Sequence, residues 1–369
     1  MVKEFENIPR YAEMIFRIKS LLKQRVLGFT DKFLIWLGLL PFFVSITCRW
    51  GIKMKRDYQL SFPFVARRND YRCLILCYHR VNDNQNSFFN GVQANVFSKQ
   101  MEVLSKYFKV LPLDNLVEQV LRNDVPPNAV AITFDDGYRD NYENAFPDLK
   151  RFGLPATIFL STGAIDSKHT LWHDRVFDAF QRTNAKFISI NRKEYPLGSR
   201  VERFAALNEF RRYLRAFNYC DWDSLIEQLI VRLDVTPDQF PANAEKLNWK
   251  EIEEMSRHNI TFGAHTVTHP ILTRLPLSEA VDEIITSKET IEAKLRFPIR
   301  LFAYPNGGRE DFNENIKKVL KEAGFLCAVS SLWGANDIQT DPFELRRVGG
   351  RNLDACAFAL RLGWYRFSS

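Results

Sequence analysis

The stretch Ala-Val-Ala-Ile-Thr-Phe-Asp-Asp-Gly at residues 129–137 joins an apolar run to two neighbouring carboxylates. A short apolar run that ends at a turn residue is typical of a parallel strand covered on both faces. In α/β folds, ligands bind where such strands end. We therefore expect a parallel α/β fold with its functional site beside Asp135 and Asp136.

The two carboxylates raise a question of charge. Successive strand residues point to opposite faces, but where a strand runs into a loop both side chains can turn into one pocket. Two ionised carboxylates in one pocket would repel each other, so this arrangement requires a cation. A solvated turn or a helix cap is the alternative interpretation of an Asp-Asp pair.

A second anchor, His-Thr-Val-Thr-His at residues 265–269, follows the short apolar run at residues 260–264. Histidines at positions i and i+4 lie on one face of a helical turn, so we expect His265 and His269 to lie side by side. Two imidazoles and one carboxylate form the open three-ligand site of a catalytic divalent metal. A structural histidine pair is the alternative.

Several sequence blocks in a fixed order resemble the polysaccharide deacetylases, the carbohydrate esterase family with a NodB homology domain. Besides the two anchors, the matching blocks are Leu-Ile-Leu-Cys-Tyr-His-Arg-Val at 74–81, Gly-Leu-Pro-Ala-Thr-Ile-Phe at 153–159 and Phe-Ala-Tyr-Pro-Asn-Gly at 302–307. The resemblance runs from about residue 72 to about residue 350 and is weakest between the anchors. It implies a distorted, incomplete (β/α) barrel and metal-dependent removal of N-acetyl or O-acetyl groups from glycans.

The resemblance also implies a role for each anchor residue. Asp136, His265 and His269 would bind the metal, most often zinc, with cobalt, nickel or manganese as alternatives. Asp135 would act as the general base that takes a proton from water. Tyr304, in the block at 302–307, would supply a backbone N–H to the oxyanion.

Two departures from the family pattern guide the remaining assignments. Leu301 stands where many members carry an Arg that orients the catalytic Asp, and we give this role to Arg347, with a surface salt bridge as the alternative. Many members use a histidine near the end of the domain as the acid, but this chain has none after His269. The Tyr-His-Arg-Val block resembles the exopolysaccharide branch, so we predict His79 as the general acid, with a structural histidine as the alternative.

Trp172 and Asn306 are the candidate substrate-binding residues. An indole face suits a sugar ring, although a core position is the alternative for Trp172. Trp172 lies within residues 165–247, a stretch with helical spacing and a possible small hairpin. We interpret this stretch as an excursion on the strand-end side of the barrel.

Residues 1–70 carry thirteen Lys or Arg and six Asp or Glu, a net charge of +7 that equals the formal charge of the whole chain. Apolar residues at helical spacing, with basic residues between them, are typical of an amphipathic helix at a membrane interface. A nucleic-acid arm would be more polar, so we expect no nucleic-acid partner. Residues 33–48 carry no charge but fall short of the roughly 20 residues that cross a bilayer. A shallow or re-entrant hairpin is our preferred interpretation; a tilted crossing and a packed helix are the alternatives.

We therefore expect a membrane-associated segment at 1–56, a linker at 57–71, a catalytic domain at 72–350 and a tail at 351–369. The predicted activity is N-deacetylation of a cell-envelope or extracellular polysaccharide or its precursor, which is hydrolysis of a carbon–nitrogen bond. O-deacetylation and non-catalytic glycan binding are the alternatives. Expected partners are the glycan, the membrane surface and other polysaccharide-synthesis proteins. Six cysteines without regular spacing favour the cytoplasmic face of the membrane.

Overall fold

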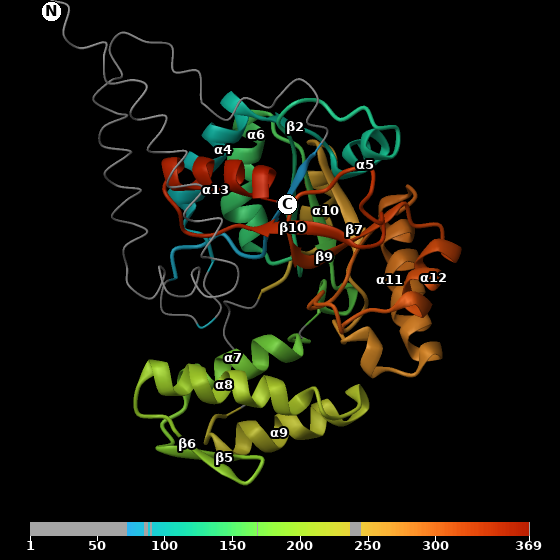
Figure 1. Cartoon of the computed structure of the whole chain (residues 1–369). Helices are drawn as coiled ribbons and strands as arrows, with labels where there is room; N and C mark the ends of the chain where they lie inside the picture. Colours follow the sequence, from blue (N-terminus) through green and yellow to red (C-terminus); the bar gives the residue numbers. More distant parts are fainter. Residues whose placement is uncertain (1–71, 85–87, 89–90, 168, 237–244, 369) are drawn as a thin grey trace, which may run out of the picture. The chain divides into compact units, whose positions relative to one another are not determined.

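The structure is a computed structural model, and it describes residues 72–84, 88, 91–167, 169–236 and 245–368 (Figure 1). The predicted membrane-associated segment at 1–56 and the linker at 57–71 lie outside these residues. Within the described part, no helix combines the length and the apolar character needed to cross a membrane.

Parallel strands form the centre of the described fold. In chain order they are β1 (Leu74–Tyr78), β2 (Lys109–Val110), β3 (Ala129–Phe134), β4 (Ala156–Leu160), β7 (Ile260–Ala264), β8 (Leu301–Ala303), β9 (Cys327–Trp333) and β10 (Leu345–Gly349). The pairing order is β1-β10-β9-β8-β7-β4-β3, and β3 pairs with β1 again, so seven strands close into a ring. β2 adds to the start of β3, and the register shifts between β9 and β10. The predicted distorted, incomplete (β/α) barrel is confirmed.

Strand β3 contributes side chains to two core clusters, one on each of its faces. All six of its residues are buried. Val130, Ile132 and Phe134 join the large core cluster that packs against helices, whereas Ala129 and Ala131 join a second cluster with Ile75 of β1 and residues of β8, β9 and β10. Because side chains alternate along a strand, the residues after Ala131 that share its face point into the ring.

Helices pack around the ring, as Figure 1 shows. They are α4 (Ala94–Tyr107), α5 (Leu113–Leu121), α6 (Phe146–Phe152), α10 (Trp249–Ser256), α11 (Leu277–Leu295), α12 (Glu314–Glu322) and α13 (Ala355–Ser368), with short π or 3-10 turns η1 (Asn141–Ala145), η2 (Thr162–Ala164) and η6 (Leu272–Arg274). Residues 351–369 were predicted as a tail, but α13 places Phe358 and Leu362 in the main core. The domain therefore continues through this helix.

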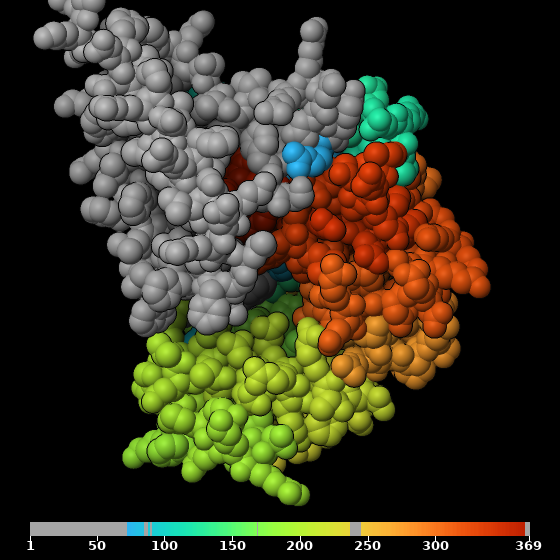
Figure 2. Space-filling view, viewed as in Figure 1, coloured from blue at the N-terminus to red at the C-terminus, as the bar shows by residue number. Residues whose placement is uncertain are grey.

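Residues 165–247 leave the ring after β4 and return before α10. They form α7 (Trp172–Arg182), the antiparallel hairpin of β5 (Phe187–Ile190) and β6 (Lys193–Pro196), α8 (Arg200–Leu214), η3 (Tyr219–Asp221) and α9 (Trp222–Arg232). These elements enclose a hydrophobic cluster of their own, and the space-filling view shows them in yellow-green as a compact mass (Figure 2). The excursion thus has its own core, which lets its helices hold side chains beside the ring.

Candidate active site

The backbone turns sharply directly after β3, where the two carboxylates follow each other in sequence. The Asp135 N–H still donates to the Tyr78 carbonyl of β1 at 3.0 Å, but Asp136 and Gly137 adopt left-handed φ values of 71° and 62°. A Cβ at position 137 would lie 2.9 Å from Leu160, so glycine suits both the conformation and the space. Asp135 pairs with Arg347, whereas Asp136 lies beside His265 and His269, so the two neighbouring carboxylates have different charged partners.

The Asp136 carboxylate lies close to two histidine side chains. Its Oδ1 lies 3.4 Å from His265 Nε2 and 3.3 Å from His269 Nε2, and all three side chains are buried. Ligands about 2.0–2.1 Å from a tetrahedral zinc ion are about 3.3 Å apart. The spacing of these donors is thus the spacing that a tetrahedral divalent ion requires.

The histidines do not lie on a helical turn, contrary to the prediction. Residues 265–269 form a loop in which Thr266 and His269 have left-handed φ values of 65° and 62°. The Glu283 carboxylate of α11 accepts hydrogen bonds from the backbone N–H groups of Val267 and Thr268 at 2.7 and 2.9 Å. It also accepts from the Thr268 hydroxyl at 2.7 Å. The three residues between the histidines are β-branched, and such residues favour an extended over a helical backbone. Glu283 accepts the hydrogen bonds that a helix would otherwise have provided for.

A metal ion fits this donor set. Asp136 Oδ1 is buried and has no hydrogen-bond partner in the described part of the chain, so it lacks the satisfaction that a buried carboxylate needs. His265 Nδ1 lies 2.7 Å from the Ala303 carbonyl, which can only accept, so Nδ1 carries the proton and Nε2 keeps its lone pair. Burial lowers the pKa of His269, which favours the neutral imidazole that metals bind.

Asp135 is held inside the ring by Arg347 of β10. Arg347 Nη1 donates to Oδ1 and Nη2 donates to Oδ2, each at 2.7 Å, and its Nε donates to the Ser330 carbonyl at 2.7 Å. The Arg347 side chain is only 1% exposed, so this contact is not a surface salt bridge. Burial alone would raise the pKa of Asp135, but the guanidinium outweighs burial and lowers the pKa to about 2. Asp135 is therefore ionised at neutral pH.

His79 follows β1 and faces the same carboxylate. Its Nε2 lies 3.8 Å from Asp135 Oδ2, and 39% of its side chain is exposed. Asn141 donates to the His79 carbonyl at 2.8 Å, and Arg80 donates to Asp140 at 2.9 Å, so contacts on both sides fix this loop. His79 thus lies beside the buried carboxylate while part of its own side chain is exposed to solvent.

Tyr304 does not have the predicted free N–H. That N–H donates to the Val329 carbonyl of β9 at 3.1 Å, and the hydroxyl donates to the Phe343 carbonyl at 2.9 Å. The ring is buried and stacks on Phe312 at 4.2 Å. The prediction that Tyr304 supplies the oxyanion donor is wrong, because sheet pairing uses that donor. Asn306 follows with a left-handed φ of 60°, and its Nδ2 is buried without a partner among the described residues.

Trp172 does not line a groove as predicted. It is only 6% exposed, and it packs edge-to-face on Trp222 with ring centres 4.8 Å apart. Its Nε1 donates to the His269 carbonyl at 2.9 Å. Trp172 is therefore a core residue of the excursion that also supports the histidine loop.

A buried polar group that contains His173, Asp174 and Lys246 lies beside Asp136. His173 Nε2 lies 3.7 Å from Asp136 Oδ2 and 3.2 Å from the Tyr138 hydroxyl, which donates to Asp174 at 2.7 Å. Lys246 Nζ lies 3.1 Å from Asp174. Burial lowers the pKa of His173 to about 3 and keeps it neutral. Adjacent His173 and Asp174 at the start of a helix were the available signal, whereas nothing local marked Lys246.

The chain matches the family model of the polysaccharide deacetylases over residues 122–328, which is more than half of its length. This match includes Asp135, Asp136, His265 and His269. His79 and Arg347 lie outside it.

Two relatives match different shares of the chain. YxkH of Bacillus subtilis, a polysaccharide deacetylase by assignment only, is 22% identical over 304 residues, which cover 81% of this chain and 78% of the relative. The poly-beta-1,6-N-acetyl-D-glucosamine N-deacetylase of Staphylococcus epidermidis is 33% identical over 108 residues, which cover 26% of this chain and 37% of that enzyme.

Two solved structures share the fold. The Streptococcus pyogenes deacetylase PplD in complex with acetate superposes with a TM-score of 0.54 at 18% identity, over 79% of this chain and 97% of that chain. IcaB from Ammonifex degensii superposes with a TM-score of 0.53 at 18% identity, over 80% of this chain and 97% of that chain. At this identity the two structures support the fold alone.

Proposed function

The chain belongs to the polysaccharide deacetylase family, and from this premise we propose that it is a metal-dependent hydrolase that removes N-acetyl groups from a polymer of N-acetylglucosamine. One juxtaposition supports this proposal above all. Asp135, which is paired with Arg347, is the sequence neighbour of Asp136, which lies beside two histidines. Such a site combines a base with the donors of a Lewis acid.

Asp136, His265 and His269 would hold the ion. Nitrogen and oxygen donors with an open position suit zinc, and cobalt, nickel and manganese are the alternatives. When bound, such an ion polarises the acetyl carbonyl and lowers the pKa of a water molecule. The Ala303 carbonyl orients His265, and the Trp172 indole supports the backbone of His269.

Asp135 would accept the proton of the attacking water. A carboxylate with a low pKa is a weak base, so its contribution comes from position and from remaining ionised. Arg347 supplies both, because a bidentate guanidinium fixes the plane of the carboxylate as well as its charge. The carbon–oxygen bond to the acetyl carbon then forms from the water oxygen.

His79 would protonate the departing nitrogen. The carbon–nitrogen bond breaks, the glycan keeps a free amine, and acetate leaves. His79 suits this role because it lies beside Asp135 and its side chain is partly exposed to solvent. The buried Asn306 amide, which lacks a partner in the described part, is our candidate for a substrate contact.

Selectivity for N-acetyl rather than O-acetyl groups rests on the staphylococcal relative, of which this chain covers 37%. An O-acetyl substrate would use the same base and the same metal donors. Only the departing atom differs, and it would be an oxygen that needs less help from an acid. Product analysis for new amines separates the two activities.

We also propose that the chain attaches to a membrane surface through residues 1–56, where a glycan of the cell envelope or its precursor would be available. The net charge of +7 in residues 1–70 and the uncharged run at 33–48 support this. Flotation of the full chain with anionic vesicles, in low and in high salt, tests it. Protein that does not float with the vesicles even in low salt would contradict surface attachment.

The enzymatic proposal is tested with the purified full chain, stripped of metal and then reconstituted with zinc. We expect acetate and new primary amines in equal amounts from N-acetylglucosamine oligomers. Asp135→Asn should abolish both products, whereas Asp124→Asn, at an exposed position, should leave both unchanged. Equal activity of Asp135→Asn and Asp124→Asn would reject the mechanism.

A further inference from the structure

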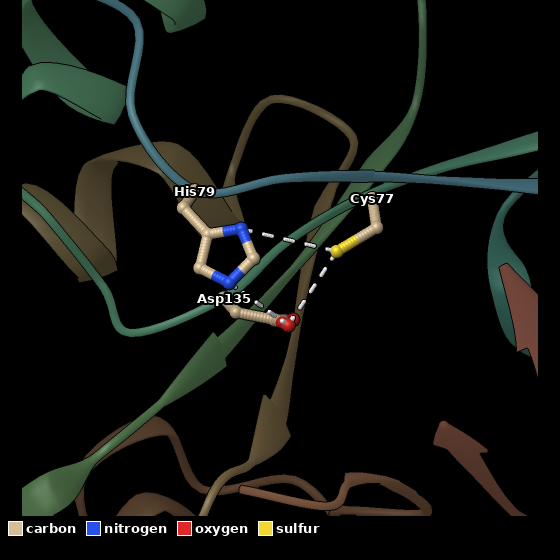
Figure 3. A group of neighbouring side chains, drawn as sticks. All are labelled: Cys77, His79 and Asp135. Carbon is tan, nitrogen blue, oxygen red and sulfur yellow. Dashed lines mark hydrogen bonds and ion pairs between the residues drawn. The ribbon is translucent and has the colours of Figure 1, made fainter. Parts of the chain in front are cut away.

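A second group of metal donors lies beside the first. Cys77 of β1, His79 in the loop after it and Asp135 after β3 each present one donor atom, and these atoms lie within 4.8 Å of one another. Cys77 Sγ lies 3.6 Å from Asp135 Oδ2 and 4.0 Å from His79 Nδ1, and His79 Nε2 lies 3.8 Å from Asp135 Oδ2 (Figure 3). None of these three residues belongs to the Asp136, His265 and His269 group.

We propose that Cys77, His79 and Asp135 form a second, weaker site for a thiophilic divalent cation such as Zn²⁺, and that its occupation inhibits the enzyme. A thiolate, an imidazole and a carboxylate are together a donor set that zinc prefers and that hard cations such as Mg²⁺ do not. The inhibitory part rests on the proposed function, whereas the binding part does not.

The geometry suits a four-coordinate ion after a small adjustment. Sulfur about 2.3 Å and nitrogen about 2.0 Å from a tetrahedral zinc ion are about 3.5 Å apart. The separation of 4.0 Å between Cys77 Sγ and His79 Nδ1 exceeds this by a few tenths of an ångström. One ion can bind only one nitrogen of His79, so the ring must also turn until that nitrogen approaches both Cys77 and Asp135. The His79 side chain is 39% exposed, so one side of it is not closely packed.

Two features make the site weaker than the first. The Arg347 guanidinium already bonds both oxygens of Asp135 and repels a cation, although each carboxylate oxygen keeps a second lone pair. The Cys77 thiol donates to Asp135 Oδ2 at 3.6 Å, so the ion must also displace this proton before the sulfur can bind. We therefore expect occupation only when metal exceeds what the first site binds.

Inhibition follows from the identity of the ligands. Asp135 is the base and His79 is the acid of the proposed reaction. A cation that takes a lone pair from each prevents the first from accepting a proton and the second from donating one. Cys77 has no part in that reaction, so it is the ligand through which the two roles can be separated.

The binding test uses cobalt, because a cobalt–thiolate bond produces a charge-transfer band in the near ultraviolet. The metal-free full chain is titrated with Co²⁺ beyond one equivalent. We expect the band in the wild type and in His269→Ala, which disrupts the first site, and its loss in Cys77→Ser. Absence of the band in the wild type, or its persistence in Cys77→Ser, would overturn the proposal. Thermal unfolding of both variants confirms that they are folded.

The inhibition test compares the rate in excess zinc with the rate of the same protein at one equivalent, so that each variant is its own reference. For Cys77→Ser, the zinc concentration that halves the rate should rise by at least about tenfold. Excess Mg²⁺ should not inhibit the wild type. Equal zinc sensitivity of wild type and Cys77→Ser would overturn the inhibitory role. If no protein releases acetate, the proposed function has failed, and the cobalt band still decides the second site.

Discussion

The Arg347 guanidinium donates one hydrogen bond to each oxygen of Asp135, although the two residues are 212 positions apart in the chain. Neither side chain reaches water to a significant extent. The pair joins β10 to the end of β3, and it sets both the ionisation and the orientation of the proposed base. Its two members are therefore the first place to test the site.

Arg347→Lys keeps the positive charge but removes the planar fork. We expect kcat to fall by about 10²-fold, because a base displaced by about 1 Å loses about that factor. Steady-state kinetics measure the effect. Arg300→Lys is the matched control, since Arg300 is an exposed arginine that contacts Glu118 instead, and an equal loss in both variants would contradict this reason.

Arg347→Leu leaves Asp135 as a buried charge without its partner. Removal of one partner of a buried ion pair costs about 3–5 kcal/mol, and urea unfolding of the metal-free protein should show a loss of that order. Adding Asp135→Asn to Arg347→Leu should recover part of the loss. A double variant no more stable than Arg347→Leu alone would mean that the unpaired charge is not the cause.

Glu283→Gln should weaken metal binding more than it weakens the fold. The Glu283 carboxylate accepts three hydrogen bonds from the loop that carries both histidines, and an amide has only one oxygen with which to accept. We expect a 10- to 100-fold lower metal affinity, about the usual effect of a supporting contact, from a competition titration with a chelator. Glu279→Gln, exposed in the same helix, should keep the wild-type affinity.

Trp172→Phe removes the indole N–H that bonds the His269 carbonyl but keeps an aromatic ring in the core. The free energy of unfolding should fall by about 1 kcal/mol, roughly the net value of one hydrogen bond. Metal affinity should fall as well. Trp364→Phe serves as the comparison, because Trp364 is 62% exposed, and it should change neither quantity.

Asp341 links pH to the stability of the segment that leads into β10. Burial alone would raise the pKa of Asp341, but the Phe343 N–H at 2.8 Å and Lys317 Nζ at 2.9 Å outweigh it and lower the pKa. A lowered pKa means that the stabilisation is present above the unfolded value of 3.8 and is lost as the pH falls below it. Asp341→Asn should therefore destabilise the protein at neutral pH, and the destabilisation should be much smaller at a pH below 3.8.

Urea unfolding at several pH values checks this expectation. Glu322→Gln, at an exposed position, provides the comparison and should show no such pH dependence. An Asp341→Asn effect of constant size from neutral to acid pH would argue against a charge-based contribution.

Sequence patterns located the barrel strands well where strands are apolar. The run at 129–134 is buried on both faces, and its end marks the site because the backbone turns there. β10 has the sequence Leu-Arg-Arg-Val-Gly, and two adjacent arginines do not suggest a buried strand. Only the second of them, Arg347, is buried. The pairing of Arg347 with Asp135 depends on closure of the ring, which no local pattern encodes.

Two local patterns suggested the wrong geometry. The spacing of His265 and His269 suits a helix, but left-handed residues and Glu283 bring them together in a loop. Tyr304 matched a family position, but its N–H is committed to β9. In both cases a tertiary contact determines the local backbone. The residues were therefore chosen correctly, but their geometry could not be predicted from local spacing.

Closure of the ring by β1 has a consequence for folding. β1 pairs with β3 on one side and with β10 on the other, so the first and last strands of the barrel must meet before Arg347 can reach Asp135. Contacts this distant along the chain form slowly, and β10 is synthesised after every other strand of the ring. The base is therefore completed only when the C-terminal strand docks, which makes catalytic competence a late event and a sensitive indicator that the whole barrel has assembled.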